Sequence, residues 1–279
     1  MALMDQTLLQ LVTRLSGLFD DVTDLTATGN GTTTTFVDTF NVNTGSESFD
    51  GCEIHFTNGS NTGLTSRITT TTASTGTLTF TPSRTSTATS DTAILLNRRN
   101  RGFRYQDYKR AINNAIEEFQ GLARIPVLEE IATAFDADVP TIAMPATTLE
   151  VYKVEYKDTR MDPDTWVEIR KATPRGGYGW SAEPEGSVIR IEGSPADEAD
   201  TYTVRLHGYK RQSALSADTD VVPFDSTALV YTAAAQLCLG SIAKDPRYSS
   251  MATTFEGKAE RNKNRIRDLR FPGTERVRL

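Results

Sequence analysis

The segments Glu53-Ile54-His55-Phe56 and Thr77-Leu78-Thr79-Phe80 alternate polar with apolar residues. This period of two is typical of β-strands that bury one face. Threonine dominates the surrounding sequence from Thr32 to Thr92, and its branched Cβ favours strands over helices. Turn-forming Gly and Asn residues separate the alternating runs. We expect a small antiparallel β-barrel or sandwich here, the alternative being a disordered linker of low complexity.

Large apolar residues recur through this threonine-rich segment and argue against the linker. A disordered segment lacks enough of them to build a core. The residues that we expect to fill the core of this first β module are Phe36, Val37, Phe40, Val42, Phe49, Ile54, Phe56, Ile68, Leu78, Phe80, Ile94 and Leu95.

Apolar residues at steps of three and four predict four helices. The first lies before the β module, and the second runs from Tyr105 to Gln120. The third runs from Ser226 to Ala243, and the fourth begins at Asp245-Pro246 and stops before Phe271-Pro272-Gly273. Each helix has a single apolar stripe and is not stable alone, so we expect the four to pack together.

The middle of the chain predicts a second antiparallel β module. Alternation favours strands at 149–156, 187–192 and 202–209, with a shorter one at 166–169. Pro and Gly residues mark the turns between them.

The expected fold class is therefore α+β, with a four-helix bundle core interrupted by two antiparallel β modules and followed by an extended C-terminal tail. The expected parts are 1–25 (N-terminal helix of the bundle), 26–97 (threonine-rich β module), 98–135 (second bundle helix and connection), 136–222 (second β module), 223–270 (C-terminal helix pair) and 271–279 (docking tail).

Composition excludes several classes of protein. The 279 residues carry a formal charge of -6, which argues against a generally basic nucleic-acid binder. No apolar run approaches the roughly 20 residues that a membrane helix needs. The N-terminal sequence carries Asp5 among regularly spaced polar residues, so no signal peptide is expected. Cys52 and Cys238 match no metal or redox spacing, and we expect two buried thiols.

The charge is divided unevenly along the chain. Residues 98–110 and 258–279 each carry +5, which leaves -16 for the remainder. For Arg98, Arg99, Arg101 and Arg104 the alternatives are a solvated surface and a contact to a partner or subunit. The C-terminal segment combines charge with apolar anchors, which is typical of a segment that orders on a partner. Protein is the preferred partner and nucleic acid the alternative, because the acidic remainder repels phosphate.

Catalytic patterns are absent from the sequence. His55 and His207 are expected at the surface or rim of strands, and two histidines in such positions do not suggest a triad or a metal site. The glycine-rich segment 176–180 lacks the lysine and the following helix of a phosphate-binding loop. Asp136/Asp138 and Asp162/Asp164 suit turns better than acid–base or cation chemistry. We expect no enzyme activity, no catalytic residue, no metal and no cofactor.

The order of these elements resembles the head-to-tail adaptor proteins of tailed bacteriophages, also called connector, head-completion or neck proteins. The resemblance rests on the helix Tyr105–Phe119, on the Ala-rich helix around Tyr231–Ala235, and on the basic last helix with its tail. The first β module, with Phe36-Val37-Asp38 before Gly51–Phe56, is similar to small β domains of phage neck proteins. The two β inserts depart from the minimal helical adaptor.

The resemblance implies a structural virion protein rather than an enzyme. Such a protein forms a ring, expected as a dodecamer, that bridges the portal protein and a tail, stopper or neck protein. DNA passes through its channel without sequence-specific binding, and no membrane is involved. The implied location is the neck of the virion, after assembly in the host cytoplasm. The residues implied to dock on the portal are Arg265, Arg267, Arg270, Phe271, Arg276, Val277, Arg278 and Leu279.

Two functions from other classes remain as alternatives. One is a receptor- or carbohydrate-binding phage structural protein, with Trp166, Tyr178 and Trp180 as a sugar platform. The other is a carboxylate-based hydrolase that uses Asp164.

Overall fold

The computed structural model divides the chain into two compact units. Unit 1 comprises residues 1–119 and 213–279, and unit 2 comprises residues 120–212. The residues that the structure describes are 5–42, 48–96, 102–120, 125–134, 141–144, 148–158, 166–171, 179–182, 188–192, 201–243 and 245–268.

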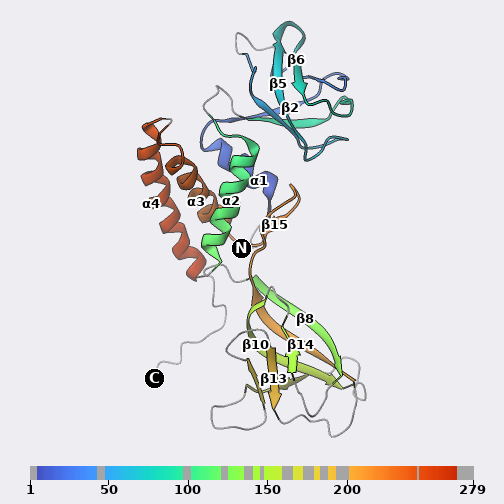
Figure 1. Ribbon diagram of the computed structural model, residues 1–279, viewed down its shortest axis with the longest axis vertical. Coiled ribbons are helices and arrows are strands. Elements are labelled where there is room, and N and C mark those ends of the chain that lie inside the picture. The colour runs from blue at the N-terminus through green and yellow to red at the C-terminus, as the bar shows by residue number, and fades with distance from the viewer. Residues whose placement is uncertain are drawn as a thin grey trace. The chain divides into compact units, whose positions relative to one another are not determined.

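Unit 1 contains the helices α1 (Leu8–Gly17), α2 (Tyr105–Phe119), α3 (Ser226–Leu239) and α4 (Arg247–Asp268). Helix α3 contacts the other three, and α1 also contacts α2. Figure 1 shows α2, α3 and α4 side by side. Thr7 begins α1 through a reciprocal capping box with Gln10, and Asp225 caps α3 by accepting a hydrogen bond from the backbone N–H of Thr227.

The apolar stripe predicted for α2 is buried as expected. Its inward side chains include two tyrosines as well as aliphatic groups, and α3 meets them with alanines that allow close packing. The buried residues of α2 are Tyr105, Tyr108, Ala111, Ile112, Ala115, Ile116 and Phe119.

The first β module is one antiparallel sheet with the strand order β2-β7-β4-β5-β6-β3. A single bridge between Gly29 and Val37 joins the chain beyond β2 to β3, so the two ends of the strand order meet as they do in a barrel. Its elements are β2 (Val22–Thr26), β3 (Thr35–Val37), β4 (Glu53–Phe56), β5 (Thr65–Thr72), the 3₁₀ turn η1 (Ala73–Thr75), β6 (Thr77–Thr81) and β7 (Thr92–Leu96).

The alternation that predicted this module is visible in its burial. Leu78 and Phe80 of β6 point into the core, while the threonines between them face outward or lie half-buried. A contiguous apolar core includes Phe36, Phe56 and Ile68 from neighbouring strands. The threonine-rich segment is therefore a folded β module rather than a linker.

Unit 2 contains two antiparallel sheets of strand orders β11-β10-β14-β8 and β12-β13-β9. Trp180, Ile189 and Val204 belong to the core that the unit buries. Its strands are β8 (Ile125–Ala134), β9 (Thr141–Ala143), β10 (Thr148–Asp158), β11 (Val167–Ile169), β12 (Gly179–Ala182), β13 (Val188–Glu192) and β14 (Thr201–Lys210). In unit 1, two short strands, β1 (Gln6–Thr7) and β15 (Val221–Val222), pair with each other.

The α+β class is confirmed, but a four-helix bundle as the core of the molecule is not shown. The described residues form more strands than helices, and each β module has a core of its own. The first helix ends at Gly17 rather than near residue 25, because residues 22–26 already pair with β7. Within residues 98–135, where a helix and a connection were expected, β8 adds a ten-residue strand to β14.

Candidate interaction surfaces

A buried cluster around His55 joins the first β module to the helices. The His55 side chain is fully buried, and its Nε2 lies 2.7 Å from Asp218 Oδ2 while Nδ1 lies 3.0 Å from Thr65 Oγ1. The ring stacks on Tyr105 of α2 with 3.7 Å between ring centroids, and the Tyr105 hydroxyl also donates to Asp218. The prediction that His55 lies at a surface or rim is wrong, because α2 and the loop before α3 cover this strand.

The loop that carries Asp218 is itself fixed to the helices. Asn113 of α2 makes two hydrogen bonds with the backbone of Leu215, at 2.8 and 3.0 Å. The backbone N–H of Leu9 in α1 donates to the Asp218 carbonyl at 3.2 Å. Contacts with two helices therefore fix the position of Asp218 beside His55. Sequence reasoning missed Asp218 because its partners lie far away in the chain.

Electrostatics favour an ionised Asp218 in this cluster. Burial by itself would raise the pKa of its carboxyl, but hydrogen bonds from His55 and Tyr105 outweigh that effect and lower the pKa. Burial raises the pKa of Tyr105, and the neighbouring carboxylate raises it further. An ionised acid thus accepts hydrogen bonds from a neutral phenol and an imidazole, an arrangement that suits a structural joint.

A second joint lies where the chain enters α2. Asp21 is buried, and its Oδ2 accepts hydrogen bonds from the backbone N–H of Phe103 at 3.0 Å and from the Tyr108 hydroxyl at 2.7 Å. Phe19 packs edge-on against Phe103 with 5.2 Å between centroids. The end of α1, the start of β2 and the start of α2 are therefore tied together.

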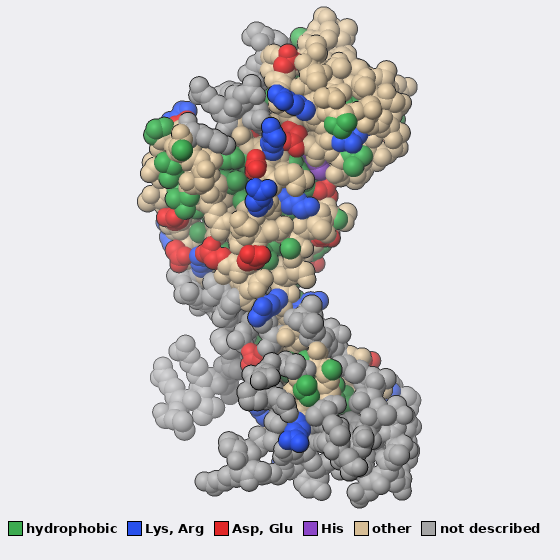
Figure 2. Space-filling model, viewed as in Figure 1, with side chains coloured by type: hydrophobic (Ala, Val, Ile, Leu, Met, Phe, Trp, Pro, Cys, Tyr) green, Lys and Arg blue, Asp and Glu red, His purple; other side chains and the backbone are tan. Residues whose placement is uncertain are grey.

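The basic cluster before α2 lies only partly within the described residues. Arg98, Arg99 and Arg101 are outside them, whereas Arg104 is exposed at the start of α2. Burial raises the pKa of Glu53, and Arg104 partly offsets this, so the arginine lies close enough to act on the first β module. Figure 2 shows basic and acidic side chains over α2, with acidic ones towards its C-terminal end.

The basic C-terminal helix uses some of its lysines inside the molecule. Lys263 Nζ lies 2.7 Å from Glu118 Oε1 of α2 and 2.8 Å from Glu260 Oε1, and it sits over the Phe119 ring. Lys258 lies over the Tyr231 ring of α3 at 5.3 Å from its centroid. These two lysines hold α4 on its neighbours, so part of the basic character counted from residue 258 serves packing.

The structure describes little of the predicted docking segment. Arg265 and Arg267 belong to the last turns of α4, but their side chains are outside the described part. The remaining docking residues also lie outside the described residues; they are Arg270, Phe271, Arg276, Val277, Arg278 and Leu279.

Unit 2 carries a network of charged residues on its larger sheet. Glu155 Oε1 lies 2.6 Å from Lys153 Nζ, and Oε2 lies 2.6 Å from His207 Nε2. Burial would raise the pKa of Glu155, but hydrogen bonds from these two neighbours outweigh it and lower the pKa. Arg205 stacks over the Trp166 ring at 3.9 Å from its centroid. His207 is partly exposed within this charge network, which agrees with the expected rim position.

The proposed sugar platform is not present in the described residues. Trp180 is only 1% exposed and belongs to the core of unit 2. Trp166 is half-buried and covered by Arg205 on one face. Tyr178 and the carboxylates Asp136, Asp138, Asp162 and Asp164 lie outside the described residues.

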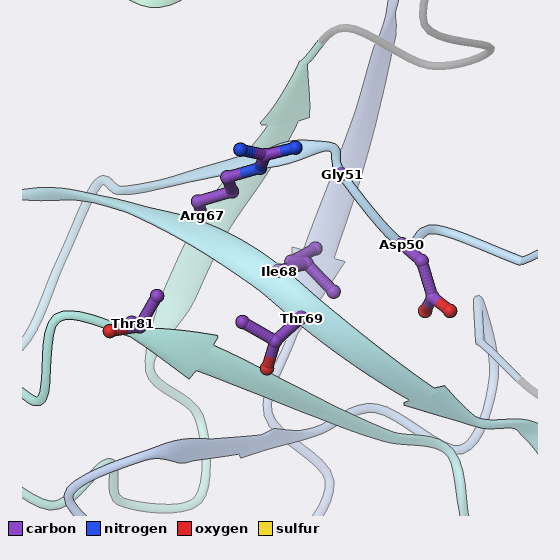
Figure 3. A pocket seen from close by; sticks show the side chains of 6 residues that line it. All are labelled: Asp50, Gly51, Arg67, Ile68, Thr69 and Thr81. Atoms are coloured by element: carbon purple, nitrogen blue, oxygen red, sulfur yellow. The ribbon is translucent and has the colours of Figure 1, made fainter.

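A hollow on the first β module lies over β5, and Figure 3 shows Arg67 extending toward Gly51 while the Asp50 carboxylate points away from Arg67. Among the described residues, no group of three His, Cys, Asp or Glu side chains is arranged to hold a metal ion. Cys52 and Cys238 are both buried thiols, as expected. Within the described part, no helix is long and apolar enough to span a membrane.

Comparison with known proteins identifies the chain. No curated protein matches it. A family model described as "SU10 adaptor protein" matches residues 83–278, a range that contains α2, the whole of unit 2, α3 and α4. This is more than two thirds of the 279 residues, and the chain therefore belongs to the SU10 adaptor family of phage head-to-tail adaptor proteins.

Proposed function

We propose that this adaptor forms a ring in the neck of the virion, between the portal protein and a tail, stopper or neck protein. The family match carries the proposal, since it covers α2, α3 and α4 and the basic C-terminal segment up to residue 278. The ring is expected as a dodecamer that assembles in the host cytoplasm. The four helices of unit 1, α3 being in contact with the other three, are its candidate bundle-like frame.

The distribution of charge supports a role beside DNA. Outside the two basic segments the chain carries -16, and an acidic channel wall would repel the phosphate backbone. DNA would then pass through the ring without sequence-specific binding. The two +5 segments are the exceptions, and those of their basic residues that do not pack against α2 and α3 are candidates for contacts to acidic protein surfaces.

We propose that the portal is bound by the residues beyond the anchored part of α4. Lys263 fixes the helix to α2, so the chain that follows starts from a defined position. Basic and apolar residues alternate from Arg276 to Leu279, which suits a segment that becomes ordered on its partner. Arg98, Arg99, Arg101 and Arg104 are candidates for a second contact, to a partner or a neighbouring subunit.

Deletion of residues 274–279 tests this assignment. The shortened chain should keep the thermal unfolding profile of the full chain, because α4 ends before the deletion. It should fail to co-purify with portal rings that retain the full-length chain. Undiminished binding by the shortened chain would refute the docking assignment, and replacing Arg276 and Arg278 by Ala separates charge from length.

A further inference from the structure

Phe40 is an aromatic side chain displayed at the surface of the first β module. The alternating pattern predicted it for the core, but it is 75% exposed, more than any other large apolar side chain among the described residues. A solvent-exposed phenylalanine keeps its apolar ring in contact with water, at a cost in free energy that burial in a partner would remove. This cost suggests that the ring is buried by a partner.

The turn that carries Phe40 is held rigidly by one buried carboxylate. Asp38 is fully buried, and its Oδ1 accepts hydrogen bonds from the backbone N–H groups of Phe40 at 2.9 Å and Asn41 at 3.0 Å. Its Oδ2 accepts from the Thr26 backbone N–H at 3.0 Å and from Asn41 Nδ2 at 2.8 Å. Four donors therefore fix the backbone on both sides of the exposed ring.

The same turn is fixed from its other side by close backbone contacts. Gly76 has a φ of +62°, and a Cβ at this position would come within 2.6 Å of the Asp38 carbonyl oxygen and of Thr39 Cα. Thr39 donates its backbone N–H to Thr28 Oγ1 at 3.0 Å. Because the backbone is ordered before binding, insertion of Phe40 into a partner would cost little further conformational entropy.

Unit 1 also carries a hollow that is large enough for such a ring and is lined in part by apolar side chains. It lies between α2 and α3 and has a volume of about 260 Å³. That is below the roughly 300–1,000 Å³ of pockets that hold drug-sized ligands, but it is large enough for one side chain. The lining includes apolar Phe103, Ala111 and Leu237, and its charged members are Asp107 and Arg110.

The charges around the two features are complementary. Residues 22–96, the first β module, carry a net charge of -4. The first part of α2 and the residue before it, residues 104–110, carry a net charge of +2 and include the groove residues Asp107 and Arg110. Opposite charges on two surfaces guide them together and disfavour contact between two copies of the same surface.

We infer that Phe40 of one copy inserts into the α2–α3 groove of a second copy. A ring closes through heterologous contacts, in which two different surfaces of one chain meet each other's counterparts on its neighbours. The first β module and the groove are such a pair of surfaces. The family match begins at residue 83, so Phe40 lies in a part of the chain that the match does not cover. The inference rests on the proposed ring.

Cysteine pairing between copies tests the contact directly. Protein carrying Phe40→Cys is mixed with protein carrying Asn114→Cys, assembled on portal rings and oxidised. Asn114 is exposed and lies at the groove, while the native Cys52 and Cys238 are buried. A disulfide-linked dimer of one copy of each variant is expected. The matched control is Leu64→Cys with Asn114→Cys, since Leu64 is 42% exposed on the same β module.

Assembly of single variants gives the second readout. Phe40→Ala should raise the concentration for half-maximal ring formation by about tenfold or more, the effect of removing an interface anchor, whereas Leu64→Ala should not. Intact rings with no Phe40–Asn114 disulfide and unchanged assembly of Phe40→Ala would overturn the inference and leave the ring in place. Linkage of Phe40→Cys to itself would overturn it in favour of a symmetric contact. Absence of any ring from the unmodified chain would overturn the proposed function, and this inference with it.

Discussion

His55 and Asp218 lie 163 residues apart in the sequence, yet His55 Nε2 lies 2.7 Å from Asp218 Oδ2 in a buried contact. The pair joins β4 of the first β module to the loop that precedes α3. Together with the stacked Tyr105, it makes the β module and the helices parts of one unit rather than independent domains. This contact and the hydrogen bonds of Asp21 both join the module to the helices.

Replacement of the acid should loosen this joint. Asp218→Asn keeps the shape but removes the charge that accepts hydrogen bonds from His55 and Tyr105. We expect it to lower the free energy of unfolding of unit 1 by about 1–3 kcal/mol, the usual cost of weakening a buried charged hydrogen bond. Urea unfolding measures this, with Glu117→Gln on the exposed face of α2 as control. An equal effect of the two substitutions would contradict the structural role of the pair.

The same pair predicts how stability depends on pH. The folded pKa of Asp218 is below its ordinary value of 3.8, so its contribution is complete above 3.8 and is lost as the pH falls through the folded pKa. His55, Tyr105 and Lys109 face this carboxylate. The stability difference between the unmodified chain and Asp218→Asn should therefore shrink in acid below pH 3.8. A stability difference that widens below pH 3.8 would contradict the expected role of the ionised Asp218.

Lys263 should anchor α4 to α2. Its side chain lies between Glu118 and Glu260 and is mostly buried, so Lys263→Ala removes both ion pairs and the contact with Phe119. We expect faster amide hydrogen exchange in the second half of α4. We also expect the free energy of unfolding of unit 1 to fall by about 1 kcal/mol. Arg261→Ala is the matched control, because Arg261 is exposed on the same helix. Unchanged exchange in Lys263→Ala would place the anchor elsewhere.

Glu155 should stabilise unit 2 without affecting unit 1. Glu155→Ala leaves Lys153 and His207 without their shared carboxylate. We expect the free energy of unfolding of unit 2 to fall by about 1–3 kcal/mol. Hydrogen exchange should rise in β10 and β14 and stay unchanged in α2 and α3. Arg190→Ala is the control, since Arg190 is exposed on β13 of the smaller sheet. A uniform rise over both units would argue against two separate folding units.

Local patterns in the sequence predict the helices and most of the strands. The prediction of the apolar stripe in α2 is correct because a helix buries one face whatever its partner. The prediction of alternation in β6 is correct because a strand also buries one face. The prediction of a helix is wrong for residues 22–26, because their pairing with β7 outweighs the continuation of the helical pattern. The prediction that Phe40 lies in the core is wrong, because the buried Asp38 fixes its turn outward. The spacing of apolar residues does not encode this turn.

The interaction surfaces are less predictable than the fold. Asp218 carries no local signal, since its role depends on a strand and a helix that are distant in sequence. Charge counting located the basic last helix, but it did not separate Lys263, which pairs with Glu118, from the residues that follow. The aromatic residue Trp180 suggested a binding platform, whereas three-dimensional packing places it in a core.

Electron cryomicroscopy of portal complexes assembled with this chain tests the central proposal most directly. The proposal predicts a closed ring of about a dozen copies on the tail side of the portal, with unit 1 helices in contact between neighbours. It also predicts that the ring is lost when residues 274–279 are deleted. Density for this chain on the capsid surface or at a fibre tip, with no ring below the portal, would contradict it.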